Sequence, residues 1–165
     1  GTGSGAIART LARARPDARG MAVDVSLAAL SVAQLNQQRL GCANVALIHA
    51  SWYDGWQAAD GLDLIISNPP YIPADDPHLS GDGVRFEPRL ALTDEADGLD
   101  AYRAIAAGAV ARLKPGGWLL VEHGHDQGAA VASLWLQAGL VDVRGRLDLS
   151  GNPRMTGGQK PARSA

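Results

Sequence analysis

The chain opens with Gly1–Ala6, "GTGSGA", a glycine-rich turn of the type that joins a buried strand to a helix in nucleotide-binding sheets. Glycine lets the backbone turn tightly and approach a ligand without interference from a Cβ atom. Asp24 ends the next predicted strand, about 20 residues further on, where a carboxylate can accept hydrogen bonds from both hydroxyls of a ribose. This pairing predicts a nucleoside-containing cofactor. An NAD-type dinucleotide stays possible, because the turn also satisfies G-x-G-x-x-A, and so does a simple strand-to-helix connection with a surface aspartate.

Predicted strands and helices alternate along the rest of the chain. We expect strands at 21–25, 45–49, 62–67, 118–122 and 141–147, and helices at 6–15, 27–40, 100–113 and 127–138. Such alternation indicates an α/β fold with a mostly parallel, doubly wound sheet. No strand precedes the glycines, so we expect this sheet to lack its first strand. We also expect one domain over residues 1–156 and a disordered tail over residues 157–165.

The composition excludes several classes of protein. The chain has 165 residues, of which 46% are hydrophobic, and a formal net charge of −2, without a basic block that would grip nucleic acid by charge alone. The single cysteine, Cys42, cannot form an internal disulfide and fits a reducing cytoplasm. We see no signal peptide and no apolar run approaching the roughly 20 residues of a membrane helix. We therefore predict a cytoplasmic protein without direct contact with nucleic acid or membrane.

A second motif, Asn68-Pro69-Pro70-Tyr71, directly follows the strand predicted at 62–67. Asn68 precedes a proline and is held in an extended conformation, and the two prolines have fixed φ angles and no N–H. The segment is therefore stiff and poor in donors. It can present the side-chain oxygen of Asn68 and the carbonyl of Pro69 as two close acceptors, beside the aromatic face of Tyr71.

Two close acceptors suit a planar –NH2 group. The nitrogen of an amide or an exocyclic amine is a poor nucleophile because its lone pair is delocalised. Hydrogen bonds from both N–H groups would return electron density to it and fix its orientation, and a positive sulfonium methyl would be a fitting electrophile. Positioning and electrostatics would then supply much of the rate gain. Alternatively, the two prolines only end a strand.

Several segments resemble one family. The motif "NPPY" after such a strand is typical of amino-nitrogen methyltransferases that use S-adenosylmethionine. The stretches "NPPYIPADDPHL", "VRFEPRLALTDEADGLDAYRAI", "LKPGGWLLVEHGHDQG" and "GNPRMT" are similar to the release factor glutamine methyltransferases. The resemblance covers residues 1 to about 156. It implies a Rossmann-like class I methyltransferase fold and transfer of a methyl group to the glutamine of the GGQ loop in peptide chain release factors.

The resemblance also implies roles for individual residues. The methionine part of the cofactor would be cradled by Gly1, Thr2, Gly3, Ser4 and Gly5. Asp24 would bind the ribose, and Trp52 would line the adenine pocket. Asn68 would contact both cofactor and target amide, with Pro69, Pro70 and Tyr71 completing the substrate site; the catalytic set would be Asn68, Pro69 and Tyr71. Glu87 and Pro88 would shape its entrance. The family's N-terminal helical domain has no counterpart in this sequence.

Other interpretations stay open on the sequence alone. A nucleic-acid adenine N6 methyltransferase would share the logic of the NPPY motif, although it would need a basic groove and a way to extrude the base. An inactive, truncated cofactor-binding fragment is a third possibility. An NAD dehydrogenase would leave NPPY unexplained. The run Glu122-His123-Gly124-His125 resembles a metal site, but its spacing matches no common zinc pattern, and we expect no metal.

Overall fold

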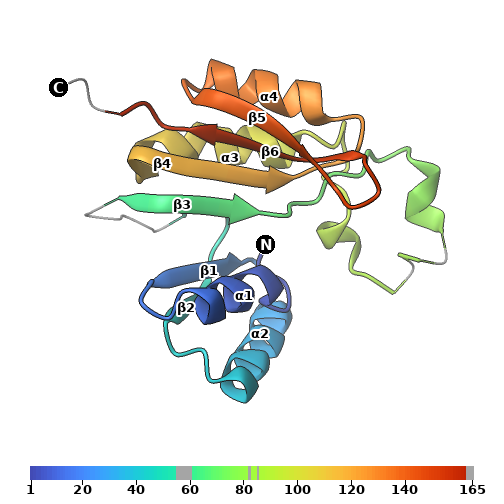
Figure 1. Cartoon of the computed structure of the whole chain (residues 1–165). Helices are drawn as coiled ribbons and strands as arrows, with labels where there is room; N and C mark the ends of the chain where they lie inside the picture. The colour runs from blue at the N-terminus through green and yellow to red at the C-terminus, as the bar shows by residue number, and fades with distance from the viewer. Residues whose placement is uncertain (55–60, 82, 85, 163–165) are drawn as a thin grey trace. The chain divides into compact units, whose positions relative to one another are not determined.

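The computed structural model describes residues 1–54, 61–81, 83–84 and 86–162 (Figure 1). The chain divides into two compact units, Gly1–Trp56 and Gln57–Ala165. Within the described ranges, no helix is both long enough and apolar enough to cross a lipid bilayer.

The first unit contains two parallel strands packed against two helices. Its elements are α1 (Ala6–Ala14), β1 (Gly20–Asp24), α2 (Leu27–Leu40) and β2 (Val45–His49). The register places Asp24 opposite His49, so that both strands end at the same edge. As predicted, the hydroxyl of Ser26 caps α2 by accepting the N–H of Ala29 at 3.2 Å, and Gly41 ends the helix at a φ of 65°.

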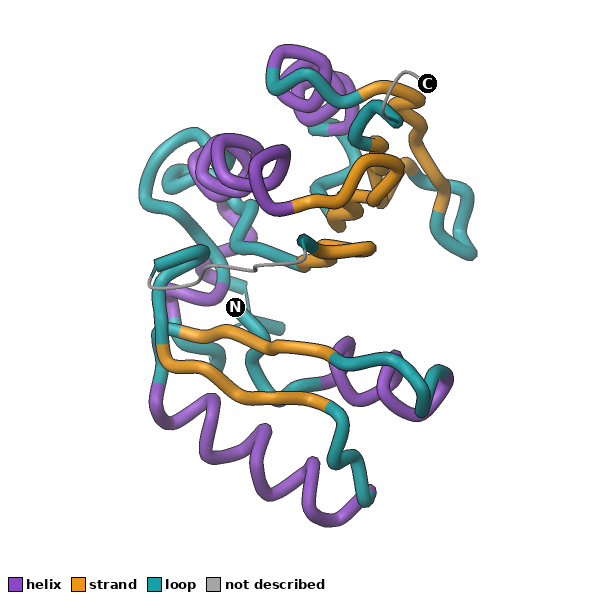
Figure 2. The backbone as a smooth tube through the Cα atoms, turned by 90° about the vertical axis from the view of Figure 1, so that its left-hand side faces the viewer, coloured by secondary structure: helices purple, strands orange, loops and turns teal. Residues whose placement is uncertain are grey.

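The second unit is built on a four-stranded sheet in the order β3-β4-β6-β5. Its elements are β3 (Leu62–Ser67), the short 3-10 helices η1 (Pro77–Ser80) and η2 (Arg89–Ala91), α3 (Asp100–Arg112), β4 (Leu113–Glu122), α4 (Gly128–Gln137), β5 (Val141–Leu147) and β6 (Pro153–Gln159). Helices α3 and α4 lie side by side on one face of this sheet (Figure 2). Between helices and sheet lies a buried core in which the rings of Tyr102 and Trp135 meet edge to face, with centroids 6.4 Å apart.

The sheet differs from the predicted one at its far side. Strands β1 and β2, and likewise β3 and β4, pair in parallel as expected, but β6 runs antiparallel to both β4 and β5. No local pattern indicated this strand, and our expectation of a disordered tail from residue 157 is wrong for residues 157–159. Gly157 and Gly158 are buried inside the sheet, where an added Cβ would lie 2.6 Å from Leu120 Cδ2 and 2.9 Å from Trp135 Cδ1, respectively. Glycine fits at these two positions because neighbouring side chains fill that space.

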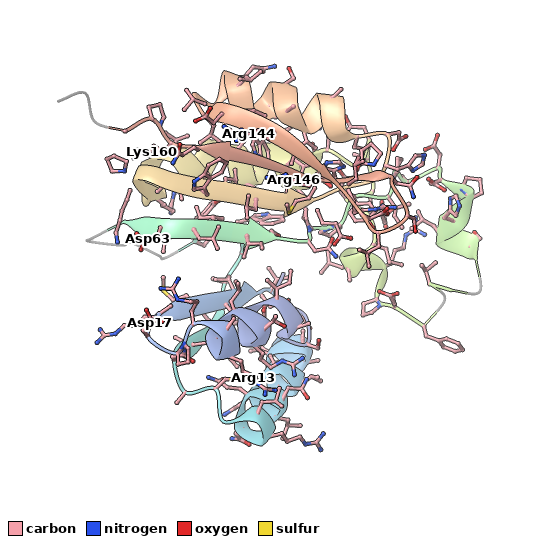
Figure 3. All side chains as sticks on the ribbon, in the orientation of Figure 1. Arg13, Asp17, Asp63, Arg144, Arg146 and Lys160 are labelled. Atoms are coloured by element: carbon pink, nitrogen blue, oxygen red, sulfur yellow. The ribbon has the colours of Figure 1, made fainter. Side chains whose placement is uncertain are left out.

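Strand β4 is also longer than predicted, because the sequence Lys114-Pro115-Gly116-Gly117 is typical of a helix terminator rather than of a strand. In the structure this segment pairs with Lys160: Gly116 donates its N–H to the Lys160 carbonyl at 3.0 Å, and the Lys160 N–H donates to the Gly117 carbonyl at 2.8 Å. The Lys160 ammonium (Figure 3) donates in turn to the carbonyls of Val110 and Leu113 at 2.7 and 2.6 Å. It therefore satisfies carbonyls that the end of α3 leaves without helical partners.

Candidate functional site

The glycine turn of the first unit is held against the end of β1. Thr2 donates its N–H to the Val23 carbonyl at 2.8 Å, and Gly5 donates to the Thr2 carbonyl at 2.9 Å. Gly3 and Gly5 have φ angles of 55° and 79°, in the left-handed region that favours glycine. An added Cβ on Gly5 would lie 3.3 Å from the Cβ of Ala33, so a larger residue would push α2 away. The turn thus has the open, close-approach backbone that the sequence predicted.

Asp24 connects this turn to the start of α2. Its carboxylate is buried and accepts the Gly3 N–H on Oδ2 at 2.8 Å and the Ser26 N–H on Oδ1 at 2.9 Å. A carboxylate offers about four lone-pair positions, so each oxygen can still accept one more hydrogen bond. Two remaining acceptors on one rigidly held group match the paired hydroxyls of a ribose. The structure brings Asp24 together with the glycine turn, and ribose binding stays a prediction.

Trp52 lies in the loop after β2. Its φ angle is 45°, which is uncommon for a bulky residue and indicates that the loop imposes this conformation. Trp52 lies inside a turn that is closed by the N–H of Asp54, which donates to the Ser51 carbonyl at 2.8 Å. The residue is half-buried. Its predicted place in an adenine pocket is compatible with this loop but not tested by it.

The segment Asn68–Tyr71 follows β3 in the second unit and forms a corner with no free backbone donor at its prolines or at Tyr71. The first two N–H groups after the prolines, those of Tyr71 and Ile72, both donate to the carbonyl of Leu92, at 3.2 and 2.9 Å. Pro69 is buried, whereas the side chain of Asn68 is exposed and has no hydrogen-bond partner among the described residues. The Asn68 carboxamide is therefore exposed, and its predicted contact with a ligand stays a prediction. We call Asn68–Tyr71 the NPPY corner.

Tyr71 is surrounded by charged residues that come from distant parts of the chain. Burial raises the pKa of its hydroxyl, as does the nearby carboxylate of Glu122, whereas Arg154 lowers this pKa through its charge and a hydrogen bond. The Arg154 guanidinium also donates to the His123 carbonyl at 3.3 Å and lies 3.6 Å from Asp148. Arg154 belongs to "GNPRMT", a stretch whose only sequence signal is the resemblance to the release factor glutamine methyltransferases. This motif was the available signal, but it gave no reason to connect residue 154 with residue 71.

Glu87 and Pro88, expected to shape the entrance of the substrate site, lie in the loop between β3 and α3. Both are exposed, and Pro88 directly precedes η2. The Glu87 N–H donates to the Val84 carbonyl at 2.9 Å. Their suggested role stays a prediction.

The histidine run after β4 is accounted for by local structure. His123 is buried, with Nδ1 2.8 Å from the Gly124 carbonyl and Nε2 2.9 Å from the Thr156 hydroxyl. Both ring nitrogens are therefore engaged within the protein. In the described part of the chain, the one group of three acidic, histidine or cysteine side chains close enough to share a metal ion consists of Asp94, Asp97 and Asp100.

That acidic group is occupied by other interactions. Arg103 donates to Asp97 at 2.6 and 2.9 Å and to Asp100 at 2.6 Å. Hydrogen bonds from Arg103 lower the pKa of Asp97 to about 2. Asp94 accepts the N–H groups of Ala96 and Gly98, and also that of Asp100, the first residue of α3. These carboxylates cap the helix and hold the loop that leads into it.

Comparison with known proteins shows which proteins this chain resembles. Residues 1–79 match a family described as "Methyltransferase small domain". The chain is 53% identical over 158 residues to a release factor glutamine methyltransferase of Bordetella pertussis, covering 96% of this chain and 58% of that protein. It is 50% identical over 161 residues to one of Xylella fastidiosa, covering 98% of this chain and again 58% of the other. Over nearly its whole length the chain is therefore similar to release factor glutamine methyltransferases.

Solved structures agree on the fold. A methyltransferase from Pyrococcus furiosus has a TM-score of 0.71 at 18% identity, with 98% of this chain and 72% of that chain covered. The S-adenosylmethionine-dependent methyltransferase SibL has a TM-score of 0.68 at 18% identity, with 98% and 49% covered. Such identities establish the fold alone, and they confirm the Rossmann-like class I methyltransferase fold. The chain spans 58% of the length of the curated release factor glutamine methyltransferases named above.

Proposed function

We propose that this chain transfers the methyl group of S-adenosylmethionine to the side-chain amide nitrogen of the GGQ glutamine in peptide chain release factors. The observation that carries the proposal is the identity of about half of all residues, over nearly the whole chain, with release factor glutamine methyltransferases. The NPPY corner supports it, because no backbone donor is free at its prolines or at Tyr71, its exposed Asn68 offers a side-chain oxygen, and an amide –NH2 needs acceptors.

The residues of the first unit fit the proposed cofactor. Asp24 keeps two acceptor positions for the ribose hydroxyls while Gly3 and Ser26 hold it in place. The left-handed φ angles of Gly3 and Gly5 leave the turn without side chains that would exclude the methionine part. Trp52 would pack against the adenine ring. When bound, S-adenosylmethionine supplies a methyl group on a positively charged sulfur.

The NPPY corner would prepare the substrate nitrogen. The side-chain oxygen of Asn68 and the carbonyl of Pro69 would each accept one N–H of the glutamine amide. These two bonds would fix the plane of the amide and return electron density to the lone pair of its nitrogen. Tyr71 would pack against that plane. On taking the methyl group, with its C–S bond broken, the substrate nitrogen would lose one proton, which would pass to water. The protein thus contributes position and electrostatics rather than a strong base.

The test is transfer of a radiolabelled methyl group from S-adenosylmethionine by the whole chain. Purified release factor, the same release factor with the GGQ glutamine changed to glutamate, and duplex DNA are offered as substrates. We expect label in the first sample only, and mass spectrometry should place one methyl group on that glutamine. Label in DNA would support the adenine methyltransferase alternative. Label in none of the samples would overturn the proposal.

A further inference from the structure

The buried side chain of Gln127 makes hydrogen bonds to the backbone of three residues in the second unit. Its amide nitrogen donates to the carbonyl of Tyr71 at 2.9 Å and to that of Gly98 at 3.3 Å. Its amide oxygen accepts the N–H of Gly124 at 2.9 Å, and the hydroxyl of Tyr102, which donates to the Glu122 carbonyl at 3.0 Å, lies 3.5 Å from it. Two carbonyls on one side and a backbone N–H on the other favour a single orientation for the amide.

The loop before α3 comes very close to Tyr71 and Gln127 where these hydrogen bonds form. Gly98 has a φ of 77°, and a Cβ at this position would lie 2.5 Å from the Tyr71 carbonyl oxygen and 2.9 Å from the Gln127 amide nitrogen. Only glycine therefore lets the loop before α3 come near enough to share the Gln127 amide with Tyr71. The prolines of the NPPY corner have no N–H, so they cannot anchor the corner by donating hydrogen bonds. The carbonyls of the corner instead need donors from other segments to fix them.

We propose that Gln127 is a positioning residue that fixes Tyr71, and with it the NPPY corner, through the hydrogen bond to the Tyr71 carbonyl. Its importance for methyl transfer rests on the function proposed above, whereas its effect on the corner does not. A glutamine at the start of α4 reaches a motif 56 residues earlier in the chain. The bond acts on the backbone of the corner, so it sets where the side chains of Asn68 and Tyr71 are presented.

The test replaces Gln127 with glutamate, which has almost the same shape but puts a carboxylate oxygen opposite the two carbonyls. We expect the amides of Tyr71 and Ile72 to exchange hydrogen at least about tenfold faster in Gln127→Glu, since local opening is no longer resisted. Amides of β4 and β6 should keep their protection. Gln127→Met, which lacks the donor without adding charge, should give the same local effect.

The pH dependence separates positioning from a general loss of packing. A carboxyl group between carbonyl oxygens is favoured in its neutral form, so its pKa is raised. Below that pKa the introduced carboxyl group can donate its proton to the Tyr71 carbonyl. Protection of the Tyr71 and Ile72 amides in Gln127→Glu should therefore recover as the pH is lowered, relative to wild type at the same pH, and Gln127→Met should show no recovery.

Gln137→Glu is the matched control, because Gln137 lies on the same helix and is exposed, with its amide bonded to the Ser133 hydroxyl. It should change neither exchange nor turnover. In Gln127→Glu, turnover should fall about 10- to 100-fold while cofactor affinity stays unchanged, since small misplacements cost rates of this size. Wild-type exchange rates at Tyr71 and Ile72 in both Gln127 variants would overturn the inference. If exchange responds but wild type methylates no release factor, the proposed function fails and the positioning role stands.

Discussion

Replacing Asp24 with asparagine tests the part of the site that the first unit builds by itself. The Asp24 carboxylate accepts two backbone N–H groups, from Gly3 and Ser26, and keeps one free acceptor position on each oxygen. Asparagine has a single oxygen, and its –NH2 group would face one of the two backbone donors. The change therefore removes an internal hydrogen bond and one acceptor for the ribose together.

The magnitudes follow from these contacts. A buried donor left without a partner costs about 1–3 kcal/mol, and the bond that remains is no longer charge-assisted, so the free energy of unfolding should fall by about 2–4 kcal/mol. Losing one charge-assisted bond to a ribose hydroxyl is worth about 1.5–3 kcal/mol, which corresponds to binding that is about 10- to 150-fold weaker. Both effects should appear in Asp24→Asn.

Urea denaturation gives the first quantity, and titration calorimetry with S-adenosylmethionine, well below the unfolding transition, gives the second. Circular dichroism establishes that the variant is folded during the titration. Asp17→Asn is the matched control, since Asp17 (Figure 3) is exposed and pairs only with Arg15, at 3.0 Å, within the described part of the chain. It should leave both quantities close to wild type. A folded Asp24→Asn protein that binds the cofactor within about threefold of wild type would refute the role of Asp24 in ribose binding.

Three further changes probe the second unit. Asn68→Ala removes the exposed carboxamide of the NPPY corner, and initial rates should fall about 100-fold or more, with a much smaller change in cofactor affinity; equal rates would remove Asn68 from the mechanism. Gly158→Ala places a methyl group against Trp135, so urea denaturation should show a loss of about 1–3 kcal/mol; an unchanged midpoint would contradict the packing of β6. Burial raises the pKa of Tyr71 and Arg154 partly offsets it. Arg154→Gln should therefore move the phenolate absorbance titration to higher pH, and movement to lower pH would contradict their contact.

Local sequence signals predicted most elements of the fold correctly. Ser26 and Gly41 mark the two ends of α2, and the structure confirms both, because capping depends on the nearest few residues. Strand β3 and the stiffness of the NPPY corner were likewise readable, since two consecutive prolines restrict the backbone whatever surrounds them.

The errors lie where distant segments meet. Residues 153–159 have no apolar alternation, and we interpreted their end as a disordered tail. In the structure they pair between β4 and β5, and Gly157 and Gly158 fit there because Leu120 and Trp135 occupy the space. The segment 114–117 has the composition of a turn, yet it belongs to β4 because it pairs with Lys160. In both cases pairing with a distant segment determined the strand. A local sequence pattern carries no information about which distant segment will pair with it.

The candidate site divides in the same way. The sequence by itself determined which residue types are available for chemistry: a glycine turn, a carboxylate about 20 residues later, and an amide before two prolines. The tertiary structure alone decided what holds them, namely that Gly3 and Ser26 fix Asp24, and that Gln127 and Arg154 reach Tyr71. The reason is physical: backbone restriction and side-chain chemistry are local properties, whereas a hydrogen bond between residues 56 positions apart exists only after the chain has folded.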